Sequence, residues 1–257
     1  MKLRELLDKI LEVQEEIGSS KPYICGGVPR DRYLGRVDSI VDLDLTTGDK
    51  TVDFLSQEVS EKLKKDYNLT RKTAADGHSS IYMGNLKLDF SSNFVLPEID
   101  NILSSMNIKN PSNMKKEMFS RDFTCNALLL DFDLKNVYDP TGNGFKDLKN
   151  KVIKTCLDPK ITLTSNKNRV VRAIYLAAKL DFDIDQSIID FVKVNPESIK
   201  ISTTKSLTEK LNEAFNSDAD KSSYLLTKMN LWDQVPITEV MRPYYSKNIK
   251  GNINVIK

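Results

Sequence analysis

Two aspartates alternate with apolar residues in segment 41–46, which reads VDLDLT. Side chains two positions apart share one face of a β-strand, so Asp42, Asp44 and Thr46 are predicted to point one way. The apolar residues between them, and Val41, are predicted to point into the core. Two carboxylates about 6 Å apart repel each other by about 3 kcal/mol at an effective dielectric constant of about 20. A Mg²⁺ ion held by Asp42 and Asp44 would offset this repulsion, and a solvated strand face is the alternative.

A third aspartate stands in a second alternating segment, 86–90, which reads LKLDF. Here Lys87 and Asp89 are predicted to share the polar face of a strand. If Asp89 faces the first two aspartates, the three carboxylates could complete a site for two metal ions. One ion would then activate an attacking hydroxyl, and the other would hold a triphosphate and its leaving group. An exposed strand aspartate without a role is the simpler alternative.

A pair of glycines precedes the first aspartates and indicates a phosphate-binding turn. The segment 25–35 reads CGGVPRDRYLG, and it is predicted to contain a strand end, Gly26-Gly27 and a helix that begins near Pro29. Glycines allow a close approach of the backbone to a ligand, and free N–H groups at a helix start suit phosphate. Arg30 adds a cation one turn into the helix. An ordinary turn before a helix is the alternative.

These residues must be positioned by elements that the hydrophobic pattern predicts. Helices are predicted at 3–17, 29–34 and 51–66, and strands at 23–25, 41–47, 79–83, 86–90, 123–131 and 151–156. Segment 91–113 is predicted to be a loop, and 139–144 a turn. From residue 158 onward only helices are predicted, among them 168–180 and 186–194. We therefore expect an α+β fold with a mixed head domain at 1–156 and an all-helical domain at 157–257.

Composition limits the classes of function. The 257 residues carry 38 Lys and Arg against 36 Asp and Glu, so any nucleic-acid binding must use a local patch. No apolar run reaches the ~20 residues of a membrane span, and the amphipathic start is unlike a signal peptide, so we expect a cytoplasmic protein with no membrane partner. The only histidine, His78, and three distant cysteines make no zinc site, and reduced, buried thiols are expected at Cys25, Cys125 and Cys156.

Four ordered motifs resemble one family, the class II tRNA nucleotidyltransferases (CCA-adding enzymes) and the bacterial-type poly(A) polymerases. The motifs are Gly26-Gly27-x-x-Arg30-Asp31 with Leu34-Gly35 and Asp42-x-Asp44; Arg121-Asp122-Phe123-Thr124-x-Asn126-Ala127-Leu128; Asp139-Pro140 with Gly142 and Asp147-Leu148; and Arg169-x-x-Arg172-Ala173 with Ala177-Ala178 and Phe182. The resemblance runs from about Tyr23 to the region of Trp232.

The resemblance implies a DNA polymerase beta-type nucleotidyltransferase head followed by a helical neck. It also implies in-line attack by an RNA 3′-oxygen on the α-phosphate of a nucleotide, with release of pyrophosphate. Asp42 and Asp44 would hold two Mg²⁺ ions, and Asp89 would help to activate the hydroxyl. The implied nucleotide-binding residues are Gly26, Gly27, Arg30, Arg121, Asp122, Asn126, Asn166, Arg169 and Arg172. The implied partners are an RNA 3′ end, tRNA first, with CTP and ATP.

The sequence departs from the family pattern at several positions. Ser165-Asn166 stands where the family's neck usually has Glu-Asp, and an amide can both accept and donate, so weaker rejection of uracil and guanine is expected. Ser120 replaces a frequent second arginine, which could weaken phosphate binding. The tail 241–257 carries basic residues beside Tyr244 and Tyr245, and it could bind single-stranded RNA, although a frayed terminus is the interpretation we favour.

Three other functions remain open at this stage. Poly(A) synthesis on general RNA is the first, because both subfamilies share the head motifs. A non-catalytic RNA-binding derivative is the second, although the intact Asp42, Asp44, Arg121 and Asp122 argue against it. A nucleotidyltransferase that acts on a protein or a small molecule is the third, and the second motif and the neck argue against it.

Overall fold

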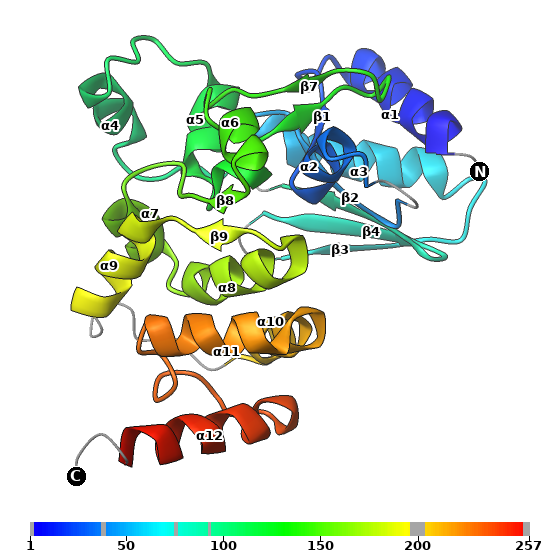
Figure 1. Cartoon of the computed structure of the whole chain (residues 1–257). Coiled ribbons are helices and arrows are strands. Elements are labelled where there is room, and N and C mark those ends of the chain that lie inside the picture. The colour runs from blue at the N-terminus through cyan, green and yellow to red at the C-terminus, as the bar shows by residue number, and fades with distance from the viewer. Residues whose placement is uncertain (1–2, 37–39, 75–76, 92–93, 196–203, 254–257) are drawn as a thin grey trace. The chain divides into compact units, whose positions relative to one another are not determined.

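The computed structural model describes residues 3–36, 40–74, 77–91, 94–195 and 204–253, and the chain forms two compact units, Met1–Phe145 and Lys146–Lys257 (Figure 1). No helix in this described part combines the length and the apolar character needed to cross a membrane. The elements of the first unit are α1 (Leu3–Ile17), β1 (Tyr23–Cys25), α2 (Gly27–Tyr33), β2 (Asp42–Thr46), α3 (Thr51–Leu63), β3 (Thr70–Thr73), β4 (Ser79–Met83), β5 (Leu86–Phe90), α4 (Ile99–Ser105), α5 (Asn113–Ser120), a 3₁₀ helix (Thr124–Asn126), β6 (Leu129–Leu130) and β7 (Val137–Tyr138), with α6 (Gly144–Lys149) at the boundary.

One seven-stranded sheet, in the order β3-β4-β5-β2-β1-β6-β7, organises the first unit. The β2–β5 pair is parallel, and the other neighbouring strands run antiparallel. The register sets Asp44 opposite Asp89 on β5 and opposite Cys25 on β1. Because directly opposite residues share a face, this register brings the chemistry-bearing residues of three strands onto one side of the sheet.

The other side of the sheet carries the hydrophobic core. Alternate residues of the central strands, such as Leu43, Leu45 and Leu88, are fully buried there. They cluster with apolar residues of α1 and α3, such as Leu7 and Leu55. Burial at about 25 cal/mol per Å² of apolar surface makes these two amphipathic helices the main support behind the polar face.

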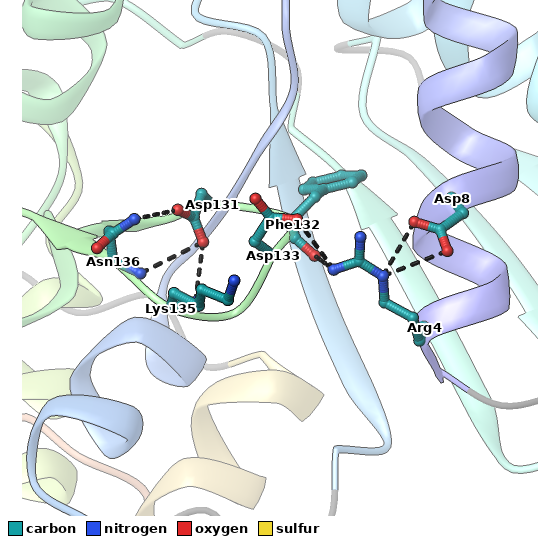
Figure 2. Close-up of polar contacts among 7 residues, drawn as sticks. All are labelled: Arg4, Asp8, Asp131, Phe132, Asp133, Lys135 and Asn136. Atoms are coloured by element: carbon teal, nitrogen blue, oxygen red, sulfur yellow. Dashed lines mark hydrogen bonds and ion pairs between the residues drawn. The ribbon is translucent and has the colours of Figure 1, made fainter.

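The start of α1 is also fixed by polar contacts to the β6–β7 turn (Figure 2). The Arg4 guanidinium donates to the Asp133 carboxylate at 3.0 Å and to the Phe132 carbonyl at 3.3 Å, and it pairs with Asp8 one turn along α1. Asp131 closes the turn by accepting from the Asn136 amide at 2.8 Å. The turn and the helix are thereby joined across the sheet edge.

The second unit is built from helices with one short pair of parallel strands. Its elements are β8 (Val152–Ile153), α7 (Pro159–Ser165), α8 (Arg169–Leu180), β9 (Asp183–Ile184), α9 (Gln186–Val194), α10 (Lys205–Ser217), α11 (Ala219–Lys228), a 3₁₀ helix (Glu239–Met241) and α12 (Arg242–Ile253). Side-chain caps from Asp158, Asp185, Thr204 and Asp218 start four of these helices. The inner face of α8 is almost wholly buried, so α8 is the centre of this unit.

The structure confirms most predicted elements, including the α+β class, α1, the β4–β5 hairpin and α8. Several expectations were wrong. Segment 91–113 contains α4, the predicted strand 123–131 is a 3₁₀ helix followed by a two-residue strand, and β9 interrupts the helices after residue 158. Val41 lies before β2 and is 55% exposed rather than part of the core. The predicted boundary at residue 156 stays a prediction.

Candidate active site

Asp42, Asp44 and Asp89 lie on the polar face of the adjacent strands β2 and β5. Asp42 is exposed, Asp44 is half-buried and Asp89 is 7% exposed, so the group grades from solvent into the protein. Thr46 shares this face, as predicted, but it is fully buried because its hydroxyl donates to the buried Glu117 carboxylate at 2.6 Å. The structure therefore brings the three predicted carboxylates together at the middle of the sheet.

The pKa of the Asp44 carboxyl is raised by burial and by two neighbouring carboxylates. These carboxylates are Asp42 and Asp89, and the charge of Arg121 opposes their effect. A divalent cation would relieve this repulsion, and Mg²⁺ is commonly bound by one or two carboxylates together with substrate phosphates. Asp42 and Asp44 fit that donor set. Within the described ranges, no group of three or more His, Cys, Asp and Glu side chains is arranged to hold a metal ion.

Asp89 is held by groups that the sequence motifs did not reveal. Its carboxylate accepts from the Ser80 hydroxyl at 2.5 Å and forms an ion pair with Lys87, and His78 Nε2 lies 3.6 Å from Oδ1. Burial alone would raise its pKa, but the hydrogen bonds from His78, Lys87 and Ser80 lower it to about 2. Asp89 is therefore a fixed anion. His78 lies beside it, and the β4–β5 register is the signal that could have identified Ser80.

The two glycines form a turn that is packed against the carboxylates. Gly26 has φ +74°, a conformation that L-residues rarely adopt, and a Cβ there would collide with the Asp44 carboxylate. A Cβ on Gly27 would lie 3.3 Å from Arg30 Nη2. Glycine is thus required at position 26 both by the backbone conformation and by the closeness of Asp44.

Arg30 does not extend freely into the site, because its guanidinium is already bound on two sides. It is 4% exposed, it pairs through Nε and Nη2 with Asp31 at 2.8 and 2.9 Å, and Nη1 donates to Asn126 Oδ1 at 2.7 Å. These bonds tie α2 to the second motif. Asn126 is buried too, and Asp122 accepts from the backbone N–H of Phe123 at 2.8 Å.

Arg121 lies within a buried network that crosses three elements. Its Nη2 donates to Glu117 Oε1 at 2.9 Å and to Cys25 Sγ at 3.0 Å, and Glu117 Oε2 accepts from Thr46 at 2.6 Å. Burial raises the pKa of the Cys25 thiol to about 12. Burial opposes the charge on Arg121, but Cys25, Glu117 and Asp44 raise its pKa above the ordinary arginine value. Sequence reasoning missed Glu117, which stands outside the recognised motifs.

Ser120, expected to weaken phosphate binding because it replaces an arginine, lies in the interior. It is fully buried, its hydroxyl accepts from the Leu96 N–H at 3.0 Å, and it donates to the Lys116 carbonyl at 2.8 Å. Ser120 therefore links the backbone at Leu96 to α5, and its side chain is not accessible to a phosphate. All three cysteines are free and buried, as predicted.

The remaining predicted nucleotide-binding residues belong to the second unit, where α7 meets α8. Asn166 is exposed at the end of α7, and its Oδ1 accepts from the Asn168 N–H at 3.1 Å. Arg169 is 8% exposed and donates to the Thr162 carbonyl and to the Ser165 hydroxyl, both at 3.1 Å, while Arg172 is exposed. Of these three, Arg172 presents the most accessible cation.

The tail differs from the frayed terminus that we favoured. Its described part forms α12, in which the rings of Tyr244 and Tyr245 pack on Phe215 and Trp232 with centroids 5.6 and 5.7 Å apart. These tyrosines therefore pack within the second unit, and we favour this structural role over base stacking. Residues 254–257 lie outside the described ranges.

Comparison with known proteins agrees with this geometry. Residues 22–154 match the family model described as the poly A polymerase head domain. The chain is 27% identical over 224 residues to tRNA nucleotidyltransferase cca2 of Schizosaccharomyces pombe, covering 82% of this chain and 46% of that protein. It is 26% identical over 185 residues to the A-adding tRNA nucleotidyltransferase of Aquifex aeolicus, and the match covers 67% of this chain and 20% of that protein.

The fold is also similar to solved structures. The CCA-adding enzyme of Bacillus stearothermophilus, solved in complex with CTP, superposes with a TM-score of 0.67 at 17% identity, over 92% of this chain and 55% of that one. This likeness shows the fold. The chain spans less than half of the length of the curated relatives named above.

Proposed function

Because the chain belongs to the poly A polymerase head-domain family, we propose that it is a template-independent RNA nucleotidyltransferase that adds CMP and AMP to the 3′ end of tRNA. Similarity to enzymes named as tRNA nucleotidyltransferases supports the choice of tRNA. The observation that carries the proposal is the cluster of Asp42, Asp44 and Asp89 beside the Gly26-Gly27 turn. A carboxylate cluster next to a glycine turn at a helix start is an arrangement that suits phosphoryl transfer.

In the proposed reaction, the RNA 3′-oxygen attacks the α-phosphate of the nucleotide and pyrophosphate leaves on the opposite side. The backbone at Gly26 and Gly27 approaches the triphosphate, and Arg121 places positive charge beside Asp44. Asp89 is held ionised by its hydrogen bonds, so it can accept a hydrogen bond from the attacking hydroxyl. Positioning and charge stabilisation supply most of the rate.

Asp42 and Asp44 are the residues proposed to hold divalent cations, with Mg²⁺ the ion that suits them. Such ions, when bound, lower the pKa of the attacking hydroxyl and neutralise charge on the phosphates. Arg30 and Asn126 are proposed to hold α2 in place for the triphosphate, through their 2.7 Å hydrogen bond. Asp122, Asn166, Arg169 and Arg172 remain proposed nucleotide ligands, and the cytoplasmic location remains a prediction.

Poly(A) synthesis is the second candidate. The description of the matching family model favours it, and Asn166, an amide where strict C and A selection would use a carboxylate, weakens the case for CCA addition. An amide oxygen and an amide nitrogen present opposite hydrogen-bonding groups, so base selection would be relaxed.

The test incubates the full chain with Mg²⁺, each of the four labelled nucleotides, and either tRNA that lacks its CCA end or a generic RNA. One to three residues added to tRNA alone would support CCA addition or repair. Long A-tails on either RNA would support poly(A) synthesis instead. No incorporation with any pair of substrates would contradict both and leave an RNA-binding derivative. A strict preference for CTP and then ATP would contradict the expectation that Asn166 weakens the rejection of uracil and guanine.

A further inference from the structure

The polar face of the sheet continues beyond the carboxylates to its β3 edge. The register pairs Lys87 of β5 with Tyr82 of β4, and it pairs Ser80 of β4 with Lys72 of β3. Because opposite residues share a face, Lys72, Tyr82 and Lys87 lie on the same side of the sheet as Asp89. We call these three residues the β3–β5 strip.

The strip is accessible and carries the two kinds of group that bind single-stranded nucleic acid. Tyr82 is 39% exposed and Lys72 is exposed, with its Nζ 5.3 Å from the centre of the Tyr82 ring. Lys87 keeps about a third of its side chain exposed. An aromatic ring can stack on any base, and adjacent lysines neutralise the phosphates that connect the bases. An exposed tyrosine between two lysines therefore fits RNA better than an acidic or an apolar partner.

The order of strands in the sheet predicts the side from which the RNA 3′ end approaches the carboxylates. The Gly26-Gly27 turn follows β1, which borders β2 on one side, whereas β5, β4 and β3 extend from the other side. In-line displacement places the attacking and leaving oxygens on opposite sides of the phosphorus. With the triphosphate on the β1 side, the attacking 3′ end comes from the β5 side. Neighbouring strands are about 4.8 Å apart, so Tyr82 lies roughly 10 Å from the carboxylates of β2, about the distance of a nucleotide next to the reacting one.

We propose that the β3–β5 strip binds the nucleotides immediately preceding the reacting 3′ end of single-stranded RNA, with a base stacked on Tyr82 and phosphates beside Lys72 and Lys87. This assignment rests on the proposed function, because the direction of approach follows from the transfer reaction. It gives the first unit an RNA contact of its own, outside the family motifs.

The test measures binding of a short fluorescent single-stranded RNA to the full chain, without nucleotide, by fluorescence anisotropy at several salt concentrations. Tyr82→Ala is expected to weaken binding about 10-fold or more, from the loss of base stacking, whereas Tyr82→Phe keeps the ring and stays within about 2-fold of wild type. Lys72→Ala is expected to reduce the slope of log affinity against log salt by about 0.7, the value for one phosphate contact on a single strand.

Lys9→Ala is the matched control, because Lys9 also lies 5.3 Å from a tyrosine ring, that of Tyr67, which packs against the core on the other side of the sheet. It removes the same charge and should leave the slope unchanged. Thermal melts confirm that each variant is folded. If Tyr82→Ala and Lys72→Ala bind RNA as wild type does, or Lys9→Ala weakens binding equally, the strip is overturned. Nucleotide addition by the wild type would then still stand. Loss of RNA binding in Tyr82→Ala together with a wild type that adds no nucleotide would support the strip and refute the transferase.

Discussion

At the scale of single residues, the closeness of Gly26 to Asp44 is the tightest constraint in the site. Gly26→Ala adds a methyl group where the backbone has φ +74° and where the Asp44 carboxylate already lies. We expect it to destabilise the protein by about 2 kcal/mol and to reduce nucleotide addition strongly, because the carboxylate must move. Urea unfolding and a nucleotide-incorporation assay measure the two effects.

Gly18→Ala is the matched control for this substitution. Gly18 has φ +65°, but nothing lies within 4 Å of the position that an added methyl group would take. The Gly18→Ala variant should therefore lose only about 1 kcal/mol of its free energy of unfolding, from the backbone conformation alone, and keep its activity. Equal losses of activity in the two variants would show that the contact with Asp44 is unimportant.

Asp44 should be essential for activity and costly for stability. Its pKa is raised in the folded protein, so at neutral pH the ionised carboxylate penalises folding, and the penalty fades as the pH falls through that raised pKa. We expect Asp44→Asn to reduce nucleotide addition by about 1,000-fold or more while the melting temperature at pH 7 stays equal or rises. The rise in melting temperature of Asp44→Asn over wild type should be smaller at pH 4 than at pH 7. A melting temperature below that of wild type at pH 7 would contradict the claim that the ionised Asp44 carboxylate destabilises the fold.

Asp89 should show the opposite dependence on pH. Its folded-state pKa of about 2 lies below the ordinary value of 3.8, so its hydrogen bonds stabilise the fold fully above about pH 4 and less as the pH falls toward 2. Asp89→Asn should therefore flatten the loss of stability between pH 4 and pH 2. Chemical unfolding at a series of pH values measures this slope, and a slope equal to that of wild type would refute the assignment.

The sequence predicted the residues of the site better than their partners. Alternation along a strand was enough to place Asp42 and Asp44 on one face, because the period of a strand is two. The partners of Arg121 were not predictable, because Cys25 and Glu117 reach it only after β1 and α5 meet in space. The prediction that Val41 is in the core was wrong, because β2 begins one residue later and Val41 lies at its exposed end.

At the scale of elements, α5 is anchored to β2 through Glu117. Its carboxylate is almost fully buried and binds both Arg121 and Thr46. We expect Glu117→Gln to destabilise the protein by about 2 kcal/mol, because the partly buried guanidinium loses its counter-charge. The KM for the nucleotide should also rise, since Arg121 is no longer fixed beside Asp44. Urea unfolding and steady-state kinetics measure these changes.

The exposed pair between Glu61 and Lys64 provides the comparison. Its charges are 2.7 Å apart, but both side chains are about half exposed. Glu61→Gln should therefore change stability by less than about 0.5 kcal/mol and leave the KM unchanged. A loss in Glu117→Gln no larger than this would show that the buried network contributes little.

Elements were missed where local signals were weak. The helix α4 begins after Glu98, which has φ +57° and no capping side chain, so the polar segment 91–113 gave no start signal. The helix α12 was predicted as a frayed end because its own pattern is polar. Tyr244 and Tyr245 pack on rings from other helices, and that tertiary contact could not be predicted from the tail itself.

At the scale of the whole molecule, the boundary between domains is open to test. The predicted head ends at residue 156, whereas the compact first unit ends at Phe145. The strand β8 lies between these two limits, and it pairs with β9, so Ile153 is buried within the second unit. A chain of residues 1–145 is expected to unfold cooperatively in urea, with a midpoint equal to that of residues 1–156.

The longer fragment should also associate, because it keeps β8 without its partner strand and exposes Ile153. Light scattering and circular dichroism compare the two fragments. If residues 1–156 stay monomeric and are the more stable of the two, the boundary at residue 156 is the better one.

The parallel pairing of β2 with β5 has a consequence for the order of folding. The two strands are separated along the chain by α3, β3 and β4, so the contact between Asp44 and Asp89 is a non-local one. Contacts of high sequence separation form slowly, because loop-closure entropy must be overcome before they contribute energy. Refolding experiments should therefore recover helix signal well before catalytic competence, and a nascent chain should remain inert until β5 has been synthesised and docked.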